Sequence, residues 1–165
     1  MRVLLDTNLL LRLDDEGHAH HDTALAALDW LAAHDHEAVI VPQVLYEYWV
    51  VATRPLEVNG LGLDVASAER AVAEWMTVFK PLLDERGVFG HWRDLVSAHE
   101  VKGKNAHDAR LVAAMQRHRV TTLVLNPTHS VIVFGRLIGE HVAGRMSEFK
   151  GTSRCQTWRW NSTRN

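Results

Sequence analysis

A short apolar strand that ends abruptly in three polar residues opens the chain and constrains its fold more than any other feature. Residues 1–5 are apolar except for Arg2, and Asp6, Thr7 and Asn8 follow them without a linker. A run this short is typical of a central strand in a parallel sheet that is covered on both faces. The polar residues then lie at the carboxyl end of the strand, where open α/β sheets place their ligands.

The three polar residues also have a purely structural interpretation. Asp, Thr and Asn are preferred residues at helix N-caps, and the leucines within residues 9–13 can begin a helix. Asp6 is therefore either a helix cap or a member of a functional site. The rest of the chain has to supply the carboxylates that decide between these two interpretations.

The composition is that of a single globular domain. The chain has 165 residues, of which 47% are hydrophobic and 23% are charged, and no apolar run is near the roughly 18 residues of a membrane span. Its one cysteine, Cys155, excludes an internal disulfide, and the N-terminus lacks the apolar region of a secretory signal. We therefore expect a cytoplasmic protein. The net charge of −2 excludes binding of nucleic acid by an overall basic surface, so any such contact has to be local.

The remainder of the chain alternates strands with helices. Buried strands are predicted over residues 38–41 and 120–125, and helices from Asp22, from Asp64 and over residues 43–54, 88–99 and 106–118. This order predicts an α/β fold in which helices cover a parallel sheet on both sides. One domain then spans residues 1–149, with a strand over residues 131–134 and a helix over residues 137–149. The polar tail over residues 150–165 is expected to be disordered.

Residues at the helix ends carry specific signals. Pro42 suits the first turn of a helix, and Asp64 and Asn105 suit the caps of the helices that follow them. Pro55 is expected to stop the helix that begins near Pro42. The helix from Asp22 is predicted to place four apolar residues on one buried face: Leu25, Leu28, Leu31 and Ala32.

Two more carboxylates, Glu47 and Asp108, belong to predicted helices. Val50 and Val51 make the side of the helix that carries Glu47 unexpectedly apolar for a solvated residue. Asp108 lies in the first turn of its helix, where the helix dipole favours a carboxylate. In a parallel sheet Asp6, Glu47 and Asp108 can all face one edge. Three carboxylates that share a site repel one another and stay ionised only with a hard cation between them, such as magnesium or manganese.

Four stretches of the chain match one known family in the same order. They read LLDTN at residues 4–8, VPQVLYEYW at 41–49, TRP at 53–55 with NGLGL at 59–63, and KNAHDARL at 104–111. In these motifs the chain resembles the PIN-domain family, in its VapC-type toxin branch, and the resemblance covers about residues 1–127. The resemblance implies a three-layer α/β/α fold with a central parallel sheet.

The resemblance also implies an activity and its partners. The matching acidic residues of the family, here Asp6, Glu47 and Asp108, hold Mg²⁺ or Mn²⁺ in a metal-dependent endoribonuclease, and Asn8 supports the first carboxylate. Such enzymes are the toxins of type II toxin–antitoxin pairs, usually act as homodimers on RNA, and are silenced by a small VapB-like antitoxin. Arginines next to the motif residues can contact RNA phosphates; they are Arg12, Arg54 and Arg110.

The chain departs from this branch after the third predicted strand. The family usually continues with Asn-x-x-Asp-Phe, whereas residues 126–130 read NPTHS, so His129 replaces a fourth acidic residue. Magnesium prefers oxygen ligands, and the histidine is therefore expected to weaken or abolish a second metal position. Either a reading-frame change near codon 129 replaced the C-terminus, or this is a variant in which three carboxylates suffice.

Two other functions are compatible with the sequence alone. A catalytically impaired PIN fold can still bind an antitoxin or RNA, and His129 and the unusual C-terminus favour this alternative. A phosphatase with Asp6 as its nucleophile is less attractive. The residues after Asp6 offer no second carboxylate two positions on to act as acid and base.

Overall fold

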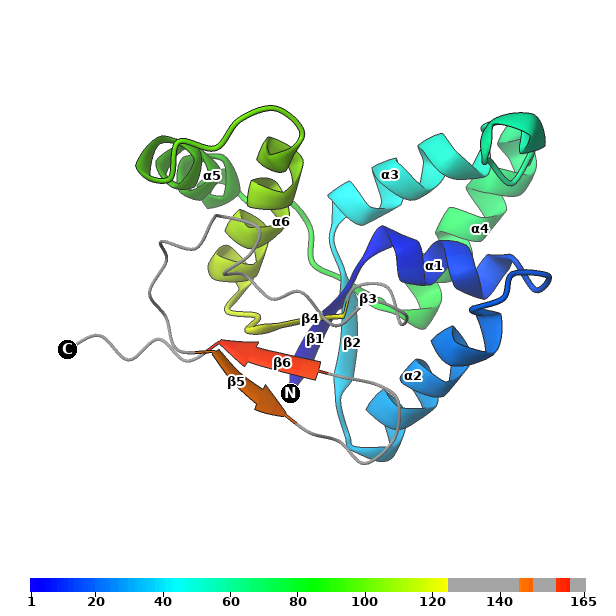
Figure 1. The fold of residues 1–165 in the computed structure, drawn as a ribbon, viewed down its shortest axis with the longest axis horizontal. Coiled ribbons are helices and arrows are strands. Elements are labelled where there is room, and N and C mark those ends of the chain that lie inside the picture. Colours follow the sequence, from blue (N-terminus) through cyan, green and yellow to red (C-terminus); the bar gives the residue numbers. More distant parts are fainter. Residues whose placement is uncertain (125–145, 150–156, 161–165) are drawn as a thin grey trace.

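A four-stranded parallel sheet forms the centre of the protein (Figure 1). The computed structural model describes residues 1–124, 146–149 and 157–160. Its elements follow one another in this order: β1 (Arg2–Leu5), α1 (Thr7–Asp14), α2 (His21–Ala33), β2 (Glu37–Ile40), α3 (Pro42–Ala52), the 3₁₀ helix η1 (Leu56–Val58), α4 (Val65–Val78), β3 (Lys80–Pro81), α5 (Arg86–Ala98), α6 (Asn105–His118), β4 (Thr122–Val124), β5 (Met146–Phe149) and β6 (Thr157–Trp160).

The strand order of the sheet is β3-β2-β1-β4, and every pairing in it is parallel. Leu4 of β1 lies opposite Val39 of β2 and Leu123 of β4, so β1 is an inner strand. In Figure 1, α5 and α6 lie on one side of the sheet and α1 and α2 on the other. The structure thus confirms the predicted α/β fold, with a parallel sheet between two helical layers. Within the described residues, every helix is too short or too polar to cross a membrane.

The core is built around β1. Val3, Leu4 and Leu5 have no exposed surface. Because β1 is covered on both faces, apolar residues fill successive positions of the strand, as predicted for a central parallel strand. The neighbouring strands add buried side chains at Val39, Ile40, Leu123 and Val124.

The helix ends confirm two signals of the sequence and correct a third. Pro42 is the first residue of α3, and Asp64 caps α4 because its Oδ1 accepts a hydrogen bond from the Ser67 amide at 2.7 Å. Asn105 is not a cap but the first residue of α6. Lys104 precedes it and already has helical backbone angles, so the helical conformation begins before Asn105 can act as a cap.

The buried face of α2 differs from the predicted one. Leu25 is 43% exposed and Ala32 is also exposed, so the sequence prediction was wrong at both positions. The buried side chains of α2 are Ala24, Ala27 and Leu31, which follow a helical spacing of three and four residues. The prediction was right for Leu31, and Leu28 is partly buried against the core, but small alanines form most of the buried face.

The C-terminal predictions meet the structure only in part. Met146–Phe149, predicted to end a helix over residues 137–149, form β5 instead, because they pair antiparallel with Thr157–Trp160 of β6. β6 belongs to the tail over residues 150–165, for which the sequence predicts disorder, and the other tail residues lie outside the described part. The strand predicted over residues 131–134 and His129 also lie outside the described residues.

Two leucines of α2 test which of its faces is buried. Leu31→Ala is expected to lower the free energy of unfolding by about 2–5 kcal/mol, because Leu31 is 2% exposed and its loss leaves a cavity. Leu25→Ala is the matched control on the same helix, with an expected change within about 0.5 kcal/mol. Urea unfolding followed by circular dichroism measures both. Equal losses would show that α2 buries Leu25 as well.

Candidate functional site

Asp6 lies where β1 ends and α1 begins. Its side chain is almost fully buried, and its Oδ2 accepts hydrogen bonds from Asn8 Nδ2 at 2.8 Å and from the Asn8 amide at 3.4 Å. The amide contact makes Asp6 the N-cap of α1. The two interpretations of Asp6 are therefore compatible, because the same side chain caps a helix and lies at the carboxyl edge of the sheet.

Glu47 is held by hydrogen bonds to both of its carboxylate oxygens. Thr7 Oγ1 donates to Oε2 at 3.0 Å, and Gln43 Nε2 donates to Oε1 at 2.8 Å. Thr7 belongs to α1, and Gln43 lies one turn before Glu47 on α3, so the carboxylate is fixed from two helices. Glu47 is half-buried and constrained, unlike an ordinary surface glutamate.

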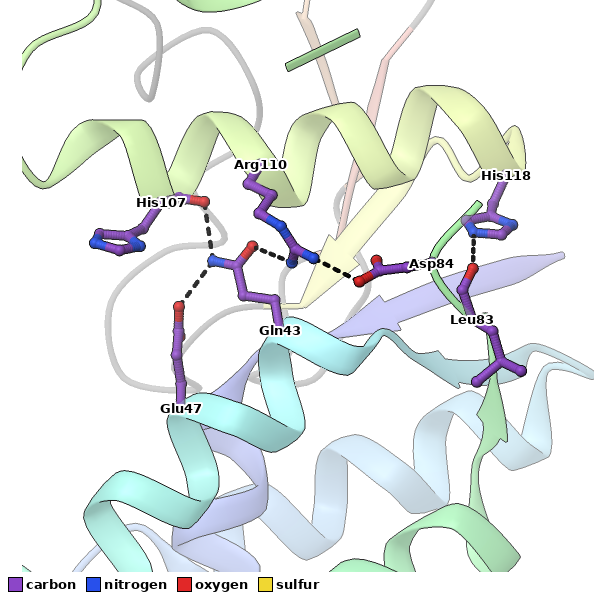
Figure 2. A network of polar contacts seen from close by, with 7 residues as sticks. All are labelled: Gln43, Glu47, Leu83, Asp84, His107, Arg110 and His118. Atoms are coloured by element: carbon purple, nitrogen blue, oxygen red, sulfur yellow. Dashed lines mark hydrogen bonds and ion pairs between the residues drawn. The ribbon is translucent and has the colours of Figure 1, made fainter. Parts of the chain in front are cut away.

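Gln43 connects Glu47 to the helix on the other side of the site (Figure 2). The amide nitrogen that holds Glu47 also donates to the His107 carbonyl at 2.9 Å, and Gln43 Oε1 accepts a hydrogen bond from Arg110 Nη1 at 3.3 Å. Arg110 Nη2 donates in turn to Asp84 Oδ2 at 2.6 Å. Gln43 is buried, and its amide finds partners within the protein, as buried polar groups require.

A pocket of about 650 Å³ opens beside Glu47. Its polar lining residues are Thr7, Asn8, Gln43, Glu47, Arg54, His107 and Arg110, and its apolar or aromatic ones are Leu11, Tyr46, Val50 and Val51. Two of the three arginines that the sequence singled out therefore line the same pocket as Glu47. Arg12, Asp6 and Asp108 are not among the described residues that line it. The Nε atom of Arg12 is buried and has no hydrogen-bond partner in the described part of the chain.

The three predicted site carboxylates influence one another through Glu47. Burial raises the pKa of Asp6, hydrogen bonds from Asn8 lower this pKa, and the charge of Glu47 raises it further. Burial also raises the pKa of Asp108, and the charge of Glu47 is the second cause of that increase. Glu47 therefore opposes the ionisation of both other carboxylates.

Glu47 is near each of the other two carboxylates, but the described residues do not form a complete set of metal ligands. Among the described residues, no three His, Cys, Asp or Glu side chains come close enough together to hold a metal ion. Asp6 and Asp108 are each within electrostatic range of Glu47, whose two oxygens accept the hydrogen bonds from Thr7 and Gln43. The convergence of all three carboxylates on one point stays a prediction.

A known domain matches most of the chain. The family model of the PIN domain matches residues 3–130. The chain belongs to the PIN-domain family. No curated protein matches it.

Solved structures share the fold of this PIN domain. A chain of Rickettsia felis VapBC2, bound to a DNA fragment from its promoter, superposes with a TM-score of 0.57 at 15% identity, over 76% of this chain and 88% of that chain. Mycobacterium tuberculosis VapC20, a sarcin-ricin loop cleaving toxin, gives 0.53 at 21% identity, over 72% and 85%. A toxin–antitoxin complex from Klebsiella pneumoniae gives 0.52 at 20% identity, over 74% and 84%. At these identities the likeness establishes a shared fold.

The donor chemistry of this PIN domain fits a hard divalent cation. PIN domains are typically metal-dependent nucleases, and Asp6, Glu47 and Asp108 offer only oxygen atoms, which Mg²⁺ and Mn²⁺ prefer as ligands. The pKa values of Asp6 and Asp108 are raised by burial and by the charge of Glu47. A cation close to these carboxylates would stabilise their ionised forms and thereby oppose the effects of burial and of the Glu47 charge on the two pKa values.

The roles of Thr7 and Gln43 were not predicted from the sequence. Gln43 precedes Glu47 by four residues on one helix, a spacing at which side chains meet, so this contact had a local signal. The hydrogen bond from Thr7 joins Glu47 to a residue 40 positions away, and no local pattern predicts such a contact.

Two N-caps of this protein are expected to respond to pH in opposite ways. The pKa of Asp6 is raised in the folded state, so above that pKa the ionised carboxylate lowers the free energy of unfolding. As the pH falls, Asp6 becomes protonated and the protein regains this free energy of unfolding. Asp6→Asn keeps a capping oxygen and removes the charge. In EDTA at neutral pH it is expected to raise the free energy of unfolding, with a gain that shrinks at acidic pH.

Asp64 is the matched control for Asp6. The hydrogen bonds of Ser67 lower the pKa of Asp64, so its carboxylate stabilises the fold above the unfolded pKa, and this stabilisation is lost as the pH falls through the lowered pKa. Asp64→Asn is therefore expected to lower the free energy of unfolding at neutral pH. Urea unfolding of both variants across the pH range measures the two signs. If both variants changed the free energy of unfolding in the same direction, the opposite pKa shifts of the two caps would be contradicted.

Gln43 is expected to stabilise the contact between α3 and α6. Gln43→Leu keeps the size of the side chain but leaves the Glu47 carboxylate and the His107 carbonyl without this donor, which should cost about 1–3 kcal/mol in the free energy of unfolding. Gln116→Leu, at a half-buried position of α6, is the control, with an expected change within about 0.5 kcal/mol. Thermal and urea unfolding measure both variants. If Gln43→Leu lowers the free energy of unfolding no more than Gln116→Leu does, Gln43 does not stabilise this contact.

Proposed function

We propose that this PIN domain is a metal-dependent endoribonuclease and the toxin of a type II toxin–antitoxin pair. The observation that carries the proposal is the position of Glu47. This carboxylate is anchored by Thr7 and Gln43, lines a pocket that also contains two arginines, and raises the pKa of two further carboxyl groups. Clustered carboxylates with raised pKa values beside a pocket are typical of functional sites. The arginines suit an anionic substrate.

Each residue has a defined task in this proposal. Asp6, Glu47 and Asp108 hold Mg²⁺ or Mn²⁺, and such a metal can orient a scissile phosphate, activate a water molecule and stabilise the leaving oxygen. Asn8 orients the Asp6 carboxylate through its 2.8 Å hydrogen bond. Thr7 and Gln43 fix the rotamer of Glu47.

The two arginines of the pocket bind the RNA backbone in this proposal. Arg54 and Arg110 present guanidinium groups, which suit phosphate oxygens in charge and in shape. Arg12 is not among the described residues that line the pocket, and its contact with RNA stays a prediction from the sequence alone.

The proposed partners follow from proteins that share the fold. The Klebsiella pneumoniae structure is a toxin–antitoxin complex, and the Rickettsia felis VapBC2 structure is bound to promoter DNA. Mycobacterium tuberculosis VapC20 is described as cleaving the sarcin-ricin loop, which is an RNA structure. By likeness to these proteins we assign this chain an RNA substrate and a small VapB-like antitoxin. The resemblance of its motifs to the VapC-type branch adds a homodimeric state, and the sequence composition adds a cytoplasmic location.

RNA cleavage by the purified protein tests the proposal. The wild type is expected to cut ribosomal RNA with added Mn²⁺ and to stop in EDTA. Glu47→Gln and Asp108→Asn should each lower the rate at least about 100-fold, because losing even a partner that supports a metal ligand costs about 10–100-fold. Glu57→Gln, at an exposed position of η1, is the matched control and should keep the full rate. Unchanged cleavage by Glu47→Gln would contradict the proposal.

Calorimetric Mn²⁺ binding separates this function from a second candidate. In the proposal the wild type binds Mn²⁺ and Asp108→Asn does not. A folded wild type that binds no Mn²⁺ and cuts no RNA would instead indicate a catalytically impaired PIN fold that binds an antitoxin or RNA. Two observations favour that candidate: His129 replaces the usual fourth acidic residue, and the described residues contain no complete set of metal ligands.

A further inference from the structure

A second hollow, of about 370 Å³, lies against α5 and α6. The residues that line it are Asp84, Glu85, Val88, Phe89, Trp92 and Arg110. None of the predicted metal ligands is among the described residues of this hollow, which combine two aromatic rings with two acidic residues and one arginine. It therefore differs in chemistry from the pocket beside Glu47.

The hollow is lined by two aromatic rings, of which Phe89 is exposed and Trp92 is half-buried. Phe89 is 65% exposed, an unusual state for a phenylalanine. Trp92 lies one turn further along α5, and its ring centroid is 5.5 Å from that of Phe89 at an angle of 31°. Trp92 Nε1 donates to the Ala106 carbonyl at 2.9 Å, which fixes the indole ring in place. The hollow thus presents a preorganised aromatic surface.

The acidic residues of the hollow are already paired. Asp84 binds Arg110 at 2.6 Å, and Glu85 forms an ion pair with Arg117. Arg117 is not one of the described lining residues, but its guanidinium group and that of Arg110 together match the charge of the two carboxylates, which reduces their repulsion of a polyanion.

Arg110 joins this hollow to the candidate active site. It lines both the hollow and the pocket beside Glu47, and its Nη1 donates to the Gln43 side chain that holds Glu47. A chain molecule with a phosphate at Arg110 can therefore have one neighbouring group in the hollow while its backbone continues towards Glu47.

From this continuity we infer that the hollow of Phe89 and Trp92 is a subsite for one unstacked nucleobase of the RNA substrate. The inference rests on the proposed nuclease function for the identity of the substrate. Proteins that recognise single-stranded and loop RNA commonly stack splayed bases on aromatic rings beside cationic residues. The hollow is close to the lower size limit of small-molecule sites, which suits a single base better than a protein surface.

Binding of a fluorescein-labelled oligouridylate in EDTA tests the subsite without requiring cleavage. Phe89→Ala is expected to weaken binding by about 5- to 150-fold, the range that the loss of one stacked base produces. Phe89→Trp, which keeps a stacking surface, should retain the wild-type affinity. Val78→Ala removes an equally exposed apolar side chain from α4 and is the matched control, with unchanged affinity expected. Fluorescence anisotropy measures all four proteins.

A second probe separates stacking from backbone contacts. An abasic ribose-phosphate oligomer of the same length should bind the wild type and Phe89→Ala equally, because it has no base to stack. Equal affinity of the two proteins for oligouridylate overturns the inference, as does the absence of oligouridylate binding by the wild type. An altered oligomeric state or altered antitoxin binding in Phe89→Ala, with RNA affinity unchanged, also overturns it and identifies a protein-docking surface. Binding that depends on Phe89 without any RNA cleavage supports the subsite and contradicts only the nuclease function.

Discussion

The burial of one carboxylate between β1 and α1 is the constraint on which the rest of the site depends. Asp6 follows a strand that is covered on both faces, so only a small part of this residue is exposed to bulk water. Two hydrogen bonds from Asn8 offset the cost of burial, and one of them begins α1. The start of α1 then sets the position of Thr7, whose hydroxyl group binds Glu47. One strand end thus positions two carboxylates.

Gln43 has the corresponding role between α3 and α6. Its amide nitrogen binds the Glu47 carboxylate and the carbonyl of His107, the residue directly before Asp108. The same group therefore fixes both a carboxylate and the backbone that carries the next one. Because the network of Figure 2 is partly buried, its hydrogen bonds are stronger than they would be in water, and losing one partner affects the others. The distance between α3 and α6 at this edge depends on that network.

The parts of the fold that could be predicted from the sequence follow local rules. A buried parallel strand reads as a continuous apolar run, and Pro42 and Asp64 begin helices for reasons that involve only their own turn. Leu25 and Asn105 were placed wrongly because their positions depend on how close a neighbouring helix lies and on where the backbone first becomes helical. Met146–Phe149 form a strand because they pair antiparallel with Thr157–Trp160, and a prediction from helical spacing does not consider such pairing.

The candidate site shows the same division between local and long-range information. Its carboxylates could be named from motifs that match a family, since motifs record residue types in order. The hydrogen bonds from Asn8 to Asp6 and from Gln43 to Glu47 are local. The bond from Thr7 to Glu47 spans 40 positions and the bond from Gln43 to the His107 carbonyl spans 64, and these two depend on a fold that the motifs do not describe.

The ion pair between Arg110 and Asp84 has a consequence for selectivity. An anion that binds at Nη2 of this guanidinium group must displace a carboxylate that is already bound at 2.6 Å, so the free energy gained there is the difference between two ion pairs. A weakly held or poorly oriented anion gains almost nothing from this exchange. A phosphodiester that offers two oxygens to the guanidinium fork gains more. Because Asp84 competes with any anion for this guanidinium group, the binding of a ligand to Arg110 depends on the geometry of the ligand as well as on its charge.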